Sequence, residues 1–343
     1  MPTTVIKTNA LENLLTQAWQ RRGLIACLLL PLAAIFFLII LLRRLFYRLG
    51  IFQSSTLPVP VIVVGNIFIG GTGKTPLVLW LVSILRAHGY SPGVISRGYG
   101  AHARAVIEVK SDMSAAETGD EPLLIAQKSG VPVFVGRDRV AAARGLLAAY
   151  PKVDVIISDD GLQHYALNRT IEIQLSDTRG HGNGWLLPAG PLREPVSRRS
   201  DFYVVNGGTS MPSTHTCNMQ ITGTEAEQMS DRRQRVALSS LRNRRVAAVA
   251  GIGHPARFFE MLRLQGVVLK STLALPDHFD FATNPFAGIE ADVILITEKD
   301  AVKCKGIAGI AQDTRLWVVP VDARIAEPLA QHILEKLRGQ PTA

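Results

Sequence analysis

The chain has 343 residues, enough for two domains of ordinary size, and its Lys and Arg residues outnumber Asp and Glu to give a formal net charge of +9. Hydrophobic residues make up 47% of the sequence and charged residues 19%, which excludes wholesale disorder and collagen-like or mucin-like chains. The three widely spaced cysteines predict neither a disulfide framework nor a paired-cysteine zinc site. The positive charge favours phosphate-rich partners, namely nucleotides, nucleic acids or anionic lipids.

The most apolar stretch covers residues 24–42, and all 19 of these residues are uncharged. As a helix it would be about 28 Å long, close to the hydrocarbon thickness of a bilayer. Arginines flank both ends of the stretch: Arg21, Arg22, Arg43, Arg44 and Arg48. We expect residues 1–48 to form a membrane-anchoring region, while a buried core helix remains the alternative.

From residue 60 onward, short apolar runs alternate with helical patterns. The expected strands cover residues 59–67, 92–97, 131–135, 153–158 and 171–176, and the expected helices cover 76–88, 121–129 and 137–150. Continuous apolar strands separated by helices predict an α/β fold whose mostly parallel sheet is covered on both faces.

A second α/β series follows a polar, weakly patterned region. Its expected strands lie within residues 245–253, 267–272, 292–300 and 315–322, and a helix is expected near 327–337. The predicted organisation is therefore an N-terminal membrane-anchoring region, a larger α/β lobe, a boundary or hairpin region, and a smaller α/β lobe: residues 1–48, 49–206, 207–230 and 231–343.

A glycine-rich segment, GGTGKT at residues 70–75, lies between an expected strand and an expected helix. In that context, backbone N–H groups and the helix N-terminus bind phosphates, Lys74 reaches the β- and γ-phosphates, and Thr75 ligates Mg²⁺. One position departs from the general pattern, because Phe68 stands where a glycine is usual. The predicted ATP-binding residues are Phe68, Ile69, Gly70, Gly71, Thr72, Gly73, Lys74 and Thr75.

Two adjacent carboxylates, Asp159 and Asp160, follow the strand expected at residues 153–158. An acidic residue at the tip of a strand beside the phosphate loop is the usual second contact on the Mg²⁺ side of such sites. Asp-Asp-Gly is also good turn chemistry, so a solvated turn is the alternative. We expect both residues at a metal site, together with Thr75.

Eight motifs in a fixed order carry a more specific resemblance. They are GNIFIGGTGKTP, SRGYG, GDEP, VGRDR, DDGLQH, LLPAGPLREP, LPDHFDF and TEKDAVK. From about residue 10 to residue 330, the chain resembles the tetraacyldisaccharide 4′-kinases, which are the lipid A 4′-kinases of Gram-negative bacteria. The phosphate loop of that family also lacks the first glycine, so Phe68 fits the resemblance.

The resemblance implies an ATP-dependent kinase that phosphorylates the 4′-hydroxyl of a tetra-acylated glucosamine disaccharide 1-phosphate, a precursor of lipid A. It implies a phosphate-loop lobe and a smaller α/β lobe with the active site between them. It also implies an N-terminal helix docked on inner-membrane lipids, with the active lobes on the cytoplasmic face.

The resemblance also implies roles for individual residues. Asp120 corresponds to the catalytic base, paired with His278, and an N-cap at the start of a helix is the alternative for Asp120. The expected substrate-binding residues are Glu121, Gln163, His164, Arg193 and Glu194, and capping of the turn is an equal alternative for Gln163 and His164. Arginine suits bidentate phosphate recognition.

Three other classes of protein share single features with this sequence. ParA/MinD-like ATPases carry a signature lysine immediately before the two glycines of the loop, and Ile69 stands there instead. A GTP-controlled binding module would read guanine with Asn-Lys-x-Asp, which TEKD does not match. A nucleic-acid-binding ATPase is not expected, because the basic residues are dispersed without interleaved aromatic residues.

Overall fold

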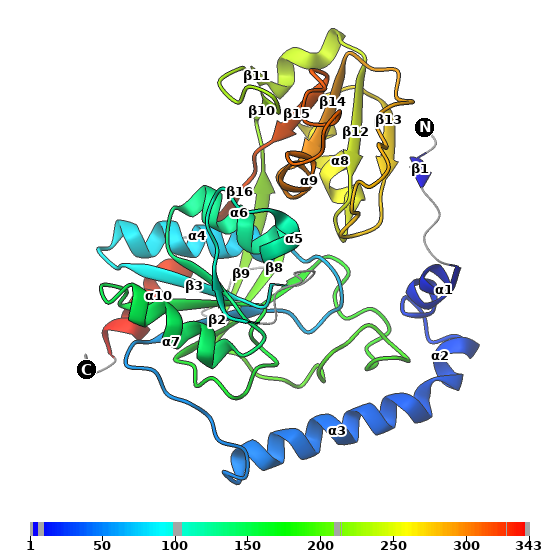
Figure 1. Ribbon diagram of the computed structural model, residues 1–343. Coiled ribbons are helices and arrows are strands. Elements are labelled where there is room, and N and C mark those ends of the chain that lie inside the picture. The colour runs from blue at the N-terminus through cyan, green and yellow to red at the C-terminus, as the bar shows by residue number, and fades with distance from the viewer. Residues whose placement is uncertain are drawn as a thin grey trace.

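The computed structural model describes residues 3–5, 10–98, 105–208, 213, 215–326 and 328–339, so Tyr99 and Gly100 of the SRGYG motif and Glu327 lie outside the described residues. Two helix-covered sheets form two lobes, and a long helix lies along the outside of the larger one (Figure 1). The expected α/β fold with mostly parallel strands is confirmed.

The larger lobe is built on a nine-stranded sheet with the order β16-β9-β8-β7-β2-β6-β3-β5-β4. Its pairings are parallel except at the two edges, where β4 pairs with β5 and β16 pairs with β9 in antiparallel fashion. The strands are β2 (Val61–Gly65), β3 (Pro92–Ser96), β4 (Ile107–Glu108), β5 (Val133–Val135), β6 (Val155–Asp159), β7 (Ile171–Asp177), β8 (Phe202–Asn206), β9 (Thr216–Thr222) and β16 (Asp322–Ile325).

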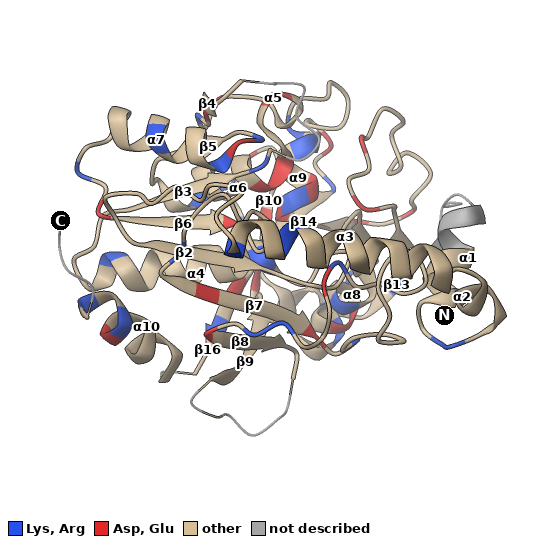
Figure 2. Ribbon diagram, turned by 90° about the horizontal axis from the view of Figure 1, so that it is seen from below, with Lys and Arg blue, Asp and Glu red and all other residues tan. Residues whose placement is uncertain are grey.

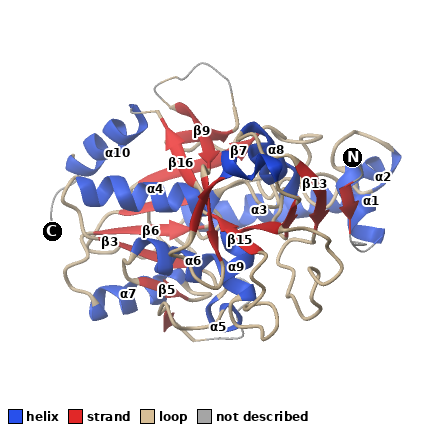
Figure 3. Ribbon diagram, turned by 90° about the horizontal axis from the view of Figure 1, so that it is seen from above, coloured by secondary structure: helices blue, strands red, loops and turns tan. Residues whose placement is uncertain are grey.

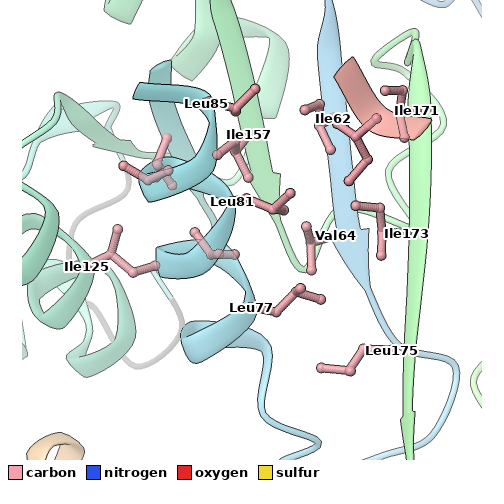
Figure 4. Packing of buried hydrophobic residues seen from close by; sticks show 14 of the residues in the cluster. Ile62, Val64, Leu77, Leu81, Leu85, Ile125, Ile157, Ile171, Ile173 and Leu175 are labelled. Carbon is pink, nitrogen blue, oxygen red and sulfur yellow. The ribbon is translucent and has the colours of Figure 1, made fainter. Parts of the chain in front are cut away.

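Helices cover both faces of this sheet because its strands are apolar on both sides. Successive side chains of a strand point to opposite faces. Ile62 and Val64 therefore pack with α4 (Lys74–Ala87), α6 (Asp120–Ser129) and α10 (Pro328–Arg338), as Figure 4 shows in part. Val61 and Val63 pack on the other face with α7 (Arg139–Ala149). Figure 3 shows α4 and α10 on one side of the sheet and α7 on the other, and the short α5 (Ala115–Thr118) precedes α6.

The smaller lobe has a seven-stranded sheet with the order β1-β13-β12-β14-β15-β10-β11. Helices α8 (Pro255–Leu264) and α9 (Glu298–Cys304) pack on its two faces, against Ala248 and Ala247 respectively. A 3₁₀ helix (Leu238–Asn243) precedes β12. The strands are β1 (Thr3–Val5), β10 (Glu225–Gln228), β11 (Arg235–Ala237), β12 (Val246–Ala250), β13 (Leu269–Ala274), β14 (Val293–Thr297) and β15 (Leu316–Val319).

Besides the N-terminal passage from β1 to β2, the chain crosses between the two sheets at two adjacent segments, between β9 and β10 and between β15 and β16. They touch so closely that a Cβ atom on Gly223 would lie 2.6 Å from the carbonyl oxygen of Pro320. After the second crossing, β16 and α10 join the larger sheet and its core. The C-terminal end thus differs from the expected lobe range of 231–343, because the apolar face of α10 packs against the larger lobe.

The apolar N-terminal stretch forms two helices instead of the single helix expected at residues 24–42. After α1 (Ala10–Ala18), the short α2 (Leu24–Leu28) is followed by α3 (Leu30–Arg48), with Pro31 in the first turn of α3. Proline is tolerated in a first turn because its missing N–H has no helical partner there. Of the described helices, α3 alone is long and apolar enough to cross a membrane by length and composition.

Most apolar side chains of α3 point away from the protein; Ile35, Leu38 and Ile39, for example, are 55–57% exposed. Figure 2 shows α3 running across the underside of the molecule, tan along most of its length. Both ends of the apolar segment are attached to the larger lobe. Trp19 Nε1 donates to the Pro188 carbonyl at 2.9 Å before it, and Arg44 Nε donates to the Tyr165 hydroxyl at 3.0 Å near its end.

Candidate active site

The glycine-rich segment forms a loop between β2 and the N-terminus of α4, which begins at Lys74. Asn66 shapes the loop, because its side-chain amide donates to the Gly70 carbonyl and to the Thr72 hydroxyl, both at 3.1 Å. Gly73 has a φ of 100°, and a Cβ atom there would lie 2.5 Å from the side-chain amide of Asn206. A larger residue at Gly73 would therefore be strained and would also clash.

Two residues outside the expected set contact the loop: Arg179, which follows β7, and Asn206, the last residue of β8. Arg179 stacks its guanidinium 4.5 Å from the ring centroid of Phe68, and its Nη2 donates to the Gly71 carbonyl at 3.0 Å. The Asn206 amide donates to the Thr72 carbonyl at 2.8 Å. Phe68 is thus a stacking platform for Arg179, which gives the departure from the general loop pattern a structural reason.

The smaller lobe meets the same loop. A Cβ atom on Gly253, in the turn between β12 and α8, would lie 2.3 Å from the backbone nitrogen of Gly71. Only glycine permits two backbones to approach this closely. The phosphate loop therefore lies at the boundary between the lobes.

Asp160, directly after β6, contacts two cations from different segments. Lys74 Nζ lies 3.5 Å from its Oδ1, and Arg193 Nη1 lies 3.2 and 3.1 Å from its two oxygens. Burial acts to raise the pKa of Asp160, but Lys74 and Arg193 outweigh it and lower the pKa. The structure thus brings together the expected loop lysine, strand-tip carboxylate and substrate-loop arginine.

Asp159 is buried at the end of β6, with its Oδ2 accepting from Ser96 Oγ at 3.1 Å and its Oδ1 without a hydrogen-bond partner. Burial, then the nearby charge of Glu121, raises the pKa of Asp159. An unpartnered buried carboxylate oxygen suits a cation, and so do the hard oxygen donors of this segment. Among the described residues no group of three or more His, Cys, Asp or Glu forms a self-sufficient metal cage, so phosphate oxygens would have to complete the coordination of Mg²⁺.

Asp120 and His278 lie together although 158 residues separate them in the sequence. His278 Nδ1 is 3.0 Å from Asp120 Oδ2, across the boundary between the lobes. Gly119, not Asp120, is the N-cap of α6, and Asp120 is the first helical residue, where its Oδ1 accepts from the backbone N–H of Glu121 at 3.0 Å. His278 has a φ of 59°, uncommon for a residue with a side chain.

Two lysines of the smaller lobe surround the same carboxylate. Lys299 Nζ and Lys303 Nζ lie 3.7 and 3.8 Å from Asp120 Oδ2. Burial acts to raise the pKa of Asp120, but the hydrogen bond from His278 and the charges of Lys299, His278 and Lys303 lower it to about 2. The bond to Asp120 in turn raises the pKa of His278. At neutral pH Asp120 is therefore an ionised carboxylate, hydrogen-bonded to His278 and close to two lysines.

The expected substrate-binding residues line the same cavity as Asp120 and Lys74, but they differ in their contacts and charge. Gln163 Nε2 donates to the Asn66 carbonyl at 3.3 Å, and Glu121 pairs with Lys299 at 3.1 Å. Burial lowers the pKa of His164 to about 4, so this imidazole is neutral at physiological pH. The carboxylate of Glu194 is only 2% exposed and is already paired with Arg44 and with Arg198, the latter at 3.0 Å.

Two adjoining cavities connect these residues. The larger, of about 1250 Å³, reaches from the phosphate loop to Phe36, Ile39 and Ile40 of α3. Of the predicted site residues it is lined by Phe68, Ile69, Gly70, Gly71, Lys74, Asp120, Glu121, Asp159, Asp160, Gln163, His164, Arg193, Glu194 and His278. The smaller, of about 170 Å³, lies between the lobes and is lined by the remaining loop residues: Thr72, Gly73 and Thr75.

Six residues that were not in the expected set contact the phosphate loop or the Asp120 carboxylate in the folded chain. They are Asn66, Arg179, Asn206, Gly253, Lys299 and Lys303. Three of them stand inside quoted motifs, Asn66 in GNIFIGGTGKTP and the two lysines in TEKDAVK, which was the available signal. No local pattern marks Arg179, Asn206 or Gly253, because their contacts depend on strand order.

Comparisons with known proteins identify the family of the chain. A family model described as tetraacyldisaccharide-1-P 4′-kinase matches residues 25–338. The chain is 57% identical to the tetraacyldisaccharide 4′-kinase of Janthinobacterium sp. (strain Marseille), over 98% of this chain and 99% of the relative. It is 53% identical to that of Herminiimonas arsenicoxydans, with the same coverage. A crystal structure described as the "apo" form of LpxK from Aquifex aeolicus in complex with ATP matches with a TM-score of 0.75 and 30% identity, over 92% of this chain and 100% of the other.

The Asp120–His278 contact predicts a specific titration. Asp120→Asn removes the carboxylate that stabilises the charged imidazole, so the pKa of His278 should fall. Asp277→Asn is the matched control, because its Oδ1 lies farther away, 4.0 Å from His278 Nε2. The measurement is an NMR pH titration, with the His278 signal assigned by its loss in His278→Ala. An equal or larger fall in Asp277→Asn would contradict the assigned pairing.

Proposed function

The chain belongs to the tetraacyldisaccharide-1-phosphate 4′-kinase family, and from that membership we propose how its own residues transfer a phosphoryl group to a lipid acceptor. It is an ATP-dependent tetraacyldisaccharide 4′-kinase of lipid A synthesis. The family match does not favour the alternative of a ParA/MinD-like ATPase.

The single observation that supports the proposed mechanism is the continuity of the larger cavity. One end holds Lys74 and Asp120, and the other end is lined by apolar side chains of α3. A disaccharide with acyl chains matches this division, because its sugars need polar contacts and its chains need apolar ones. We propose that the sugar 4′-hydroxyl lies near Asp120 while the acyl chains follow α3.

At the phosphate end, we assign charge stabilisation to Lys74 and Arg193. In phosphoryl transfer, the protein acts mainly by positioning and by stabilising charge on the transferred group. Both cations are paired with Asp160 in the structure, so they are already directed at one point. A γ-phosphate beside Asp160 would share these cations without rearrangement of the loop.

We assign the Mg²⁺ site to Thr75, Asp159 and Asp160. The unpartnered Oδ1 of Asp159 supports the choice, and the ion when bound would neutralise charge on the phosphates. The adenine base is assigned to the smaller cavity beside the loop, whose walls include Leu79, Leu124, Phe258 and Met261. An apolar slot of about 170 Å³ suits a planar base.

At the acceptor end, we assign the general base to Asp120. It is ionised and buried, and His278 holds one of its oxygens, so it can accept the proton of the sugar hydroxyl as the oxygen attacks phosphorus. Its low pKa fits a transition state in which the proton moves late, since little bond to the nucleophile forms early in a loose phosphoryl transfer. Glu121, Gln163 and neutral His164 are assigned to sugar and phosphate contacts.

We propose that α3 lies in the plane of the inner membrane, on its cytoplasmic leaflet. Both ends of the apolar segment are fixed to the same folded lobe, so its two ends cannot lie on opposite sides of a bilayer. Its outward face is apolar, and exposed arginines near its ends, Arg21 and Arg43, suit anionic headgroups.

Replacing the loop lysine should abolish most catalysis. Lys74→Ala deletes a cation that stabilises the transferring group, and the loss of one such contact typically costs about 10²–10³-fold in kcat. The measurement is phosphate transfer from ATP to the lipid in detergent micelles, with the exposed Lys152→Ala as control. Full activity of purified Lys74→Ala would refute the site.

The proposed base predicts a non-additive pair of variants. Asp120→Ala should lower the single-turnover rate by about 10²–10⁴-fold with little change in ATP affinity. His278→Ala should cost less, and the double variant should lose less than the product of the two, because the residues act as a unit. A thermal midpoint measured on each preparation separates chemistry from stability. A destabilised Asp120→Ala protein with a normal rate would leave Asp120 a purely structural role.

The in-plane helix predicts how cysteines in the flanks react. In a Cys27→Ser background the other two cysteines are buried, so Arg21→Cys and Arg48→Cys provide single exposed thiols. A membrane-impermeant maleimide added to intact spheroplasts should label neither, and permeabilised spheroplasts should be labelled at both. Labelling of one of the two in intact spheroplasts would show that the helix spans the bilayer.

A further inference from the structure

Glu194 stands next to the phosphate-side Arg193, yet its carboxylate faces away from solvent. It is buried by three partners from separate segments: Arg44 of α3, the Tyr165 hydroxyl at 2.7 Å and Arg198 at 3.0 Å. A carboxylate so enclosed has no free oxygen edge for a sugar. The contacts instead make Glu194 a junction between the apolar helix and the loop that carries Arg193.

The junction is fixed on the helix side by more than one contact. Arg44 Nε donates to the Tyr165 hydroxyl at 3.0 Å, and the rings of Tyr47 and Tyr165 are 5.7 Å apart. Arg43 lies with its guanidinium carbon 5.4 Å from the centroid of the Tyr165 ring. The last turns of α3 are therefore docked on Tyr165, which directly follows Gln163 and His164 in the chain.

On the catalytic side, the same loop is fixed to the phosphate loop. The backbone N–H of Arg193 donates to the Ile67 carbonyl at 2.7 Å, and the Arg193 side chain donates to both carboxylate oxygens of Asp160. A shift of Glu194 would move its neighbour Arg193, since adjacent residues share a planar peptide unit. A continuous path of contacts thus leads from Arg44 through Glu194 and Arg193 to Asp160.

We infer that Arg44 is a positioning residue for phosphoryl transfer: through its ion pair with Glu194, the docked apolar helix holds Arg193 at the phosphate site. This inference rests on the proposed role of Arg193. Helix α3 would then position Arg193 in addition to its membrane attachment and lipid contact. The enzyme would therefore need the docked helix even when the lipid is supplied in micelles. Arg198 and Tyr165 remain on Glu194 when Arg44 is replaced, so the buried charge keeps partners and the fold should persist.

The test uses Arg44→Met in the full-length chain. Methionine keeps length and apolar character, so membrane attachment should be unchanged while the ion pair is lost. Arg48→Met is the matched control, because Arg48 lies on the same helix and is exposed. In detergent micelles with saturating ATP and lipid, Arg44→Met should lower the single-turnover rate by about 3- to 30-fold, the range expected for residues that act through a network. Arg48→Met should keep the wild-type rate, and Arg44→Lys should recover part of the loss.

A second comparison tests the route through Arg193. In an Arg193→Gln background, Arg44→Met should lower the single-turnover rate by a further factor of less than about two, because the arginine that Arg44 positions is already absent. Two results would overturn the inference, provided that Arg193→Gln alone is impaired. One is that Arg44→Met lowers the rate by the same factor in the wild-type and Arg193→Gln backgrounds. The other is that Arg44→Met and Arg48→Met have equal rates. A wild-type rate for Arg193→Gln would refute the proposed role of Arg193 and the inference with it. Thermal midpoints identify a variant that has merely lost stability. If Arg44→Met is such a variant, the rate of Arg44→Lys decides: partial recovery of the rate supports the inference, and no recovery in a stable Arg44→Lys protein overturns it.

Discussion

The rest of the site depends on one cluster of charges, in which Asp160 holds Lys74 and Arg193. Three segments meet there: the phosphate loop, the end of β6 and the loop that follows β7. Asp160 has a φ of 48°, in the left-handed region, and its two ion pairs help to hold that conformation. With the roles proposed for Lys74 and Arg193, the pairs direct two cations at one point before substrate arrives. Little reorganisation would then be left for the moment of reaction, which is how preorganised electrostatics lowers a barrier.

The lobes divide the chemistry between them. The larger lobe supplies Asp120 and the phosphate loop, whereas the smaller lobe supplies His278, Lys299 and Lys303. The proposed base, Asp120, therefore has these three partners only when the lobes are in contact. Apart from the N-terminal stretch before β2, the chain passes between them at two adjacent segments, and the contacts around Asp120 and between Gly71 and Gly253 join the lobes at the site.

The sequence predicted the elements whose signals are local. Apolar runs located β2, β3, β5, β6 and β7 of the larger sheet and β12 to β15 of the smaller one, and the glycine-rich segment located the phosphate loop. The remaining described strands, several of them short or at sheet edges, were not predicted. The Asp120–His278 pairing was implied by the family resemblance alone, since no spacing rule joins residues so far apart. Local patterns missed the return of α10 to the larger lobe, the break before α3 and the enclosure of Glu194, because each depends on what packs against the segment in the folded chain.

The most direct measurement is the fate of the γ-phosphate. Purified protein in detergent would be incubated with ATP, Mg²⁺ and a tetra-acylated glucosamine disaccharide 1-phosphate, and the products followed by ³¹P NMR. The account predicts one new phosphomonoester on the 4′ carbon of the lipid for each ADP formed, with little inorganic phosphate. Release of inorganic phosphate equal to the ATP consumed, with or without lipid, would contradict it.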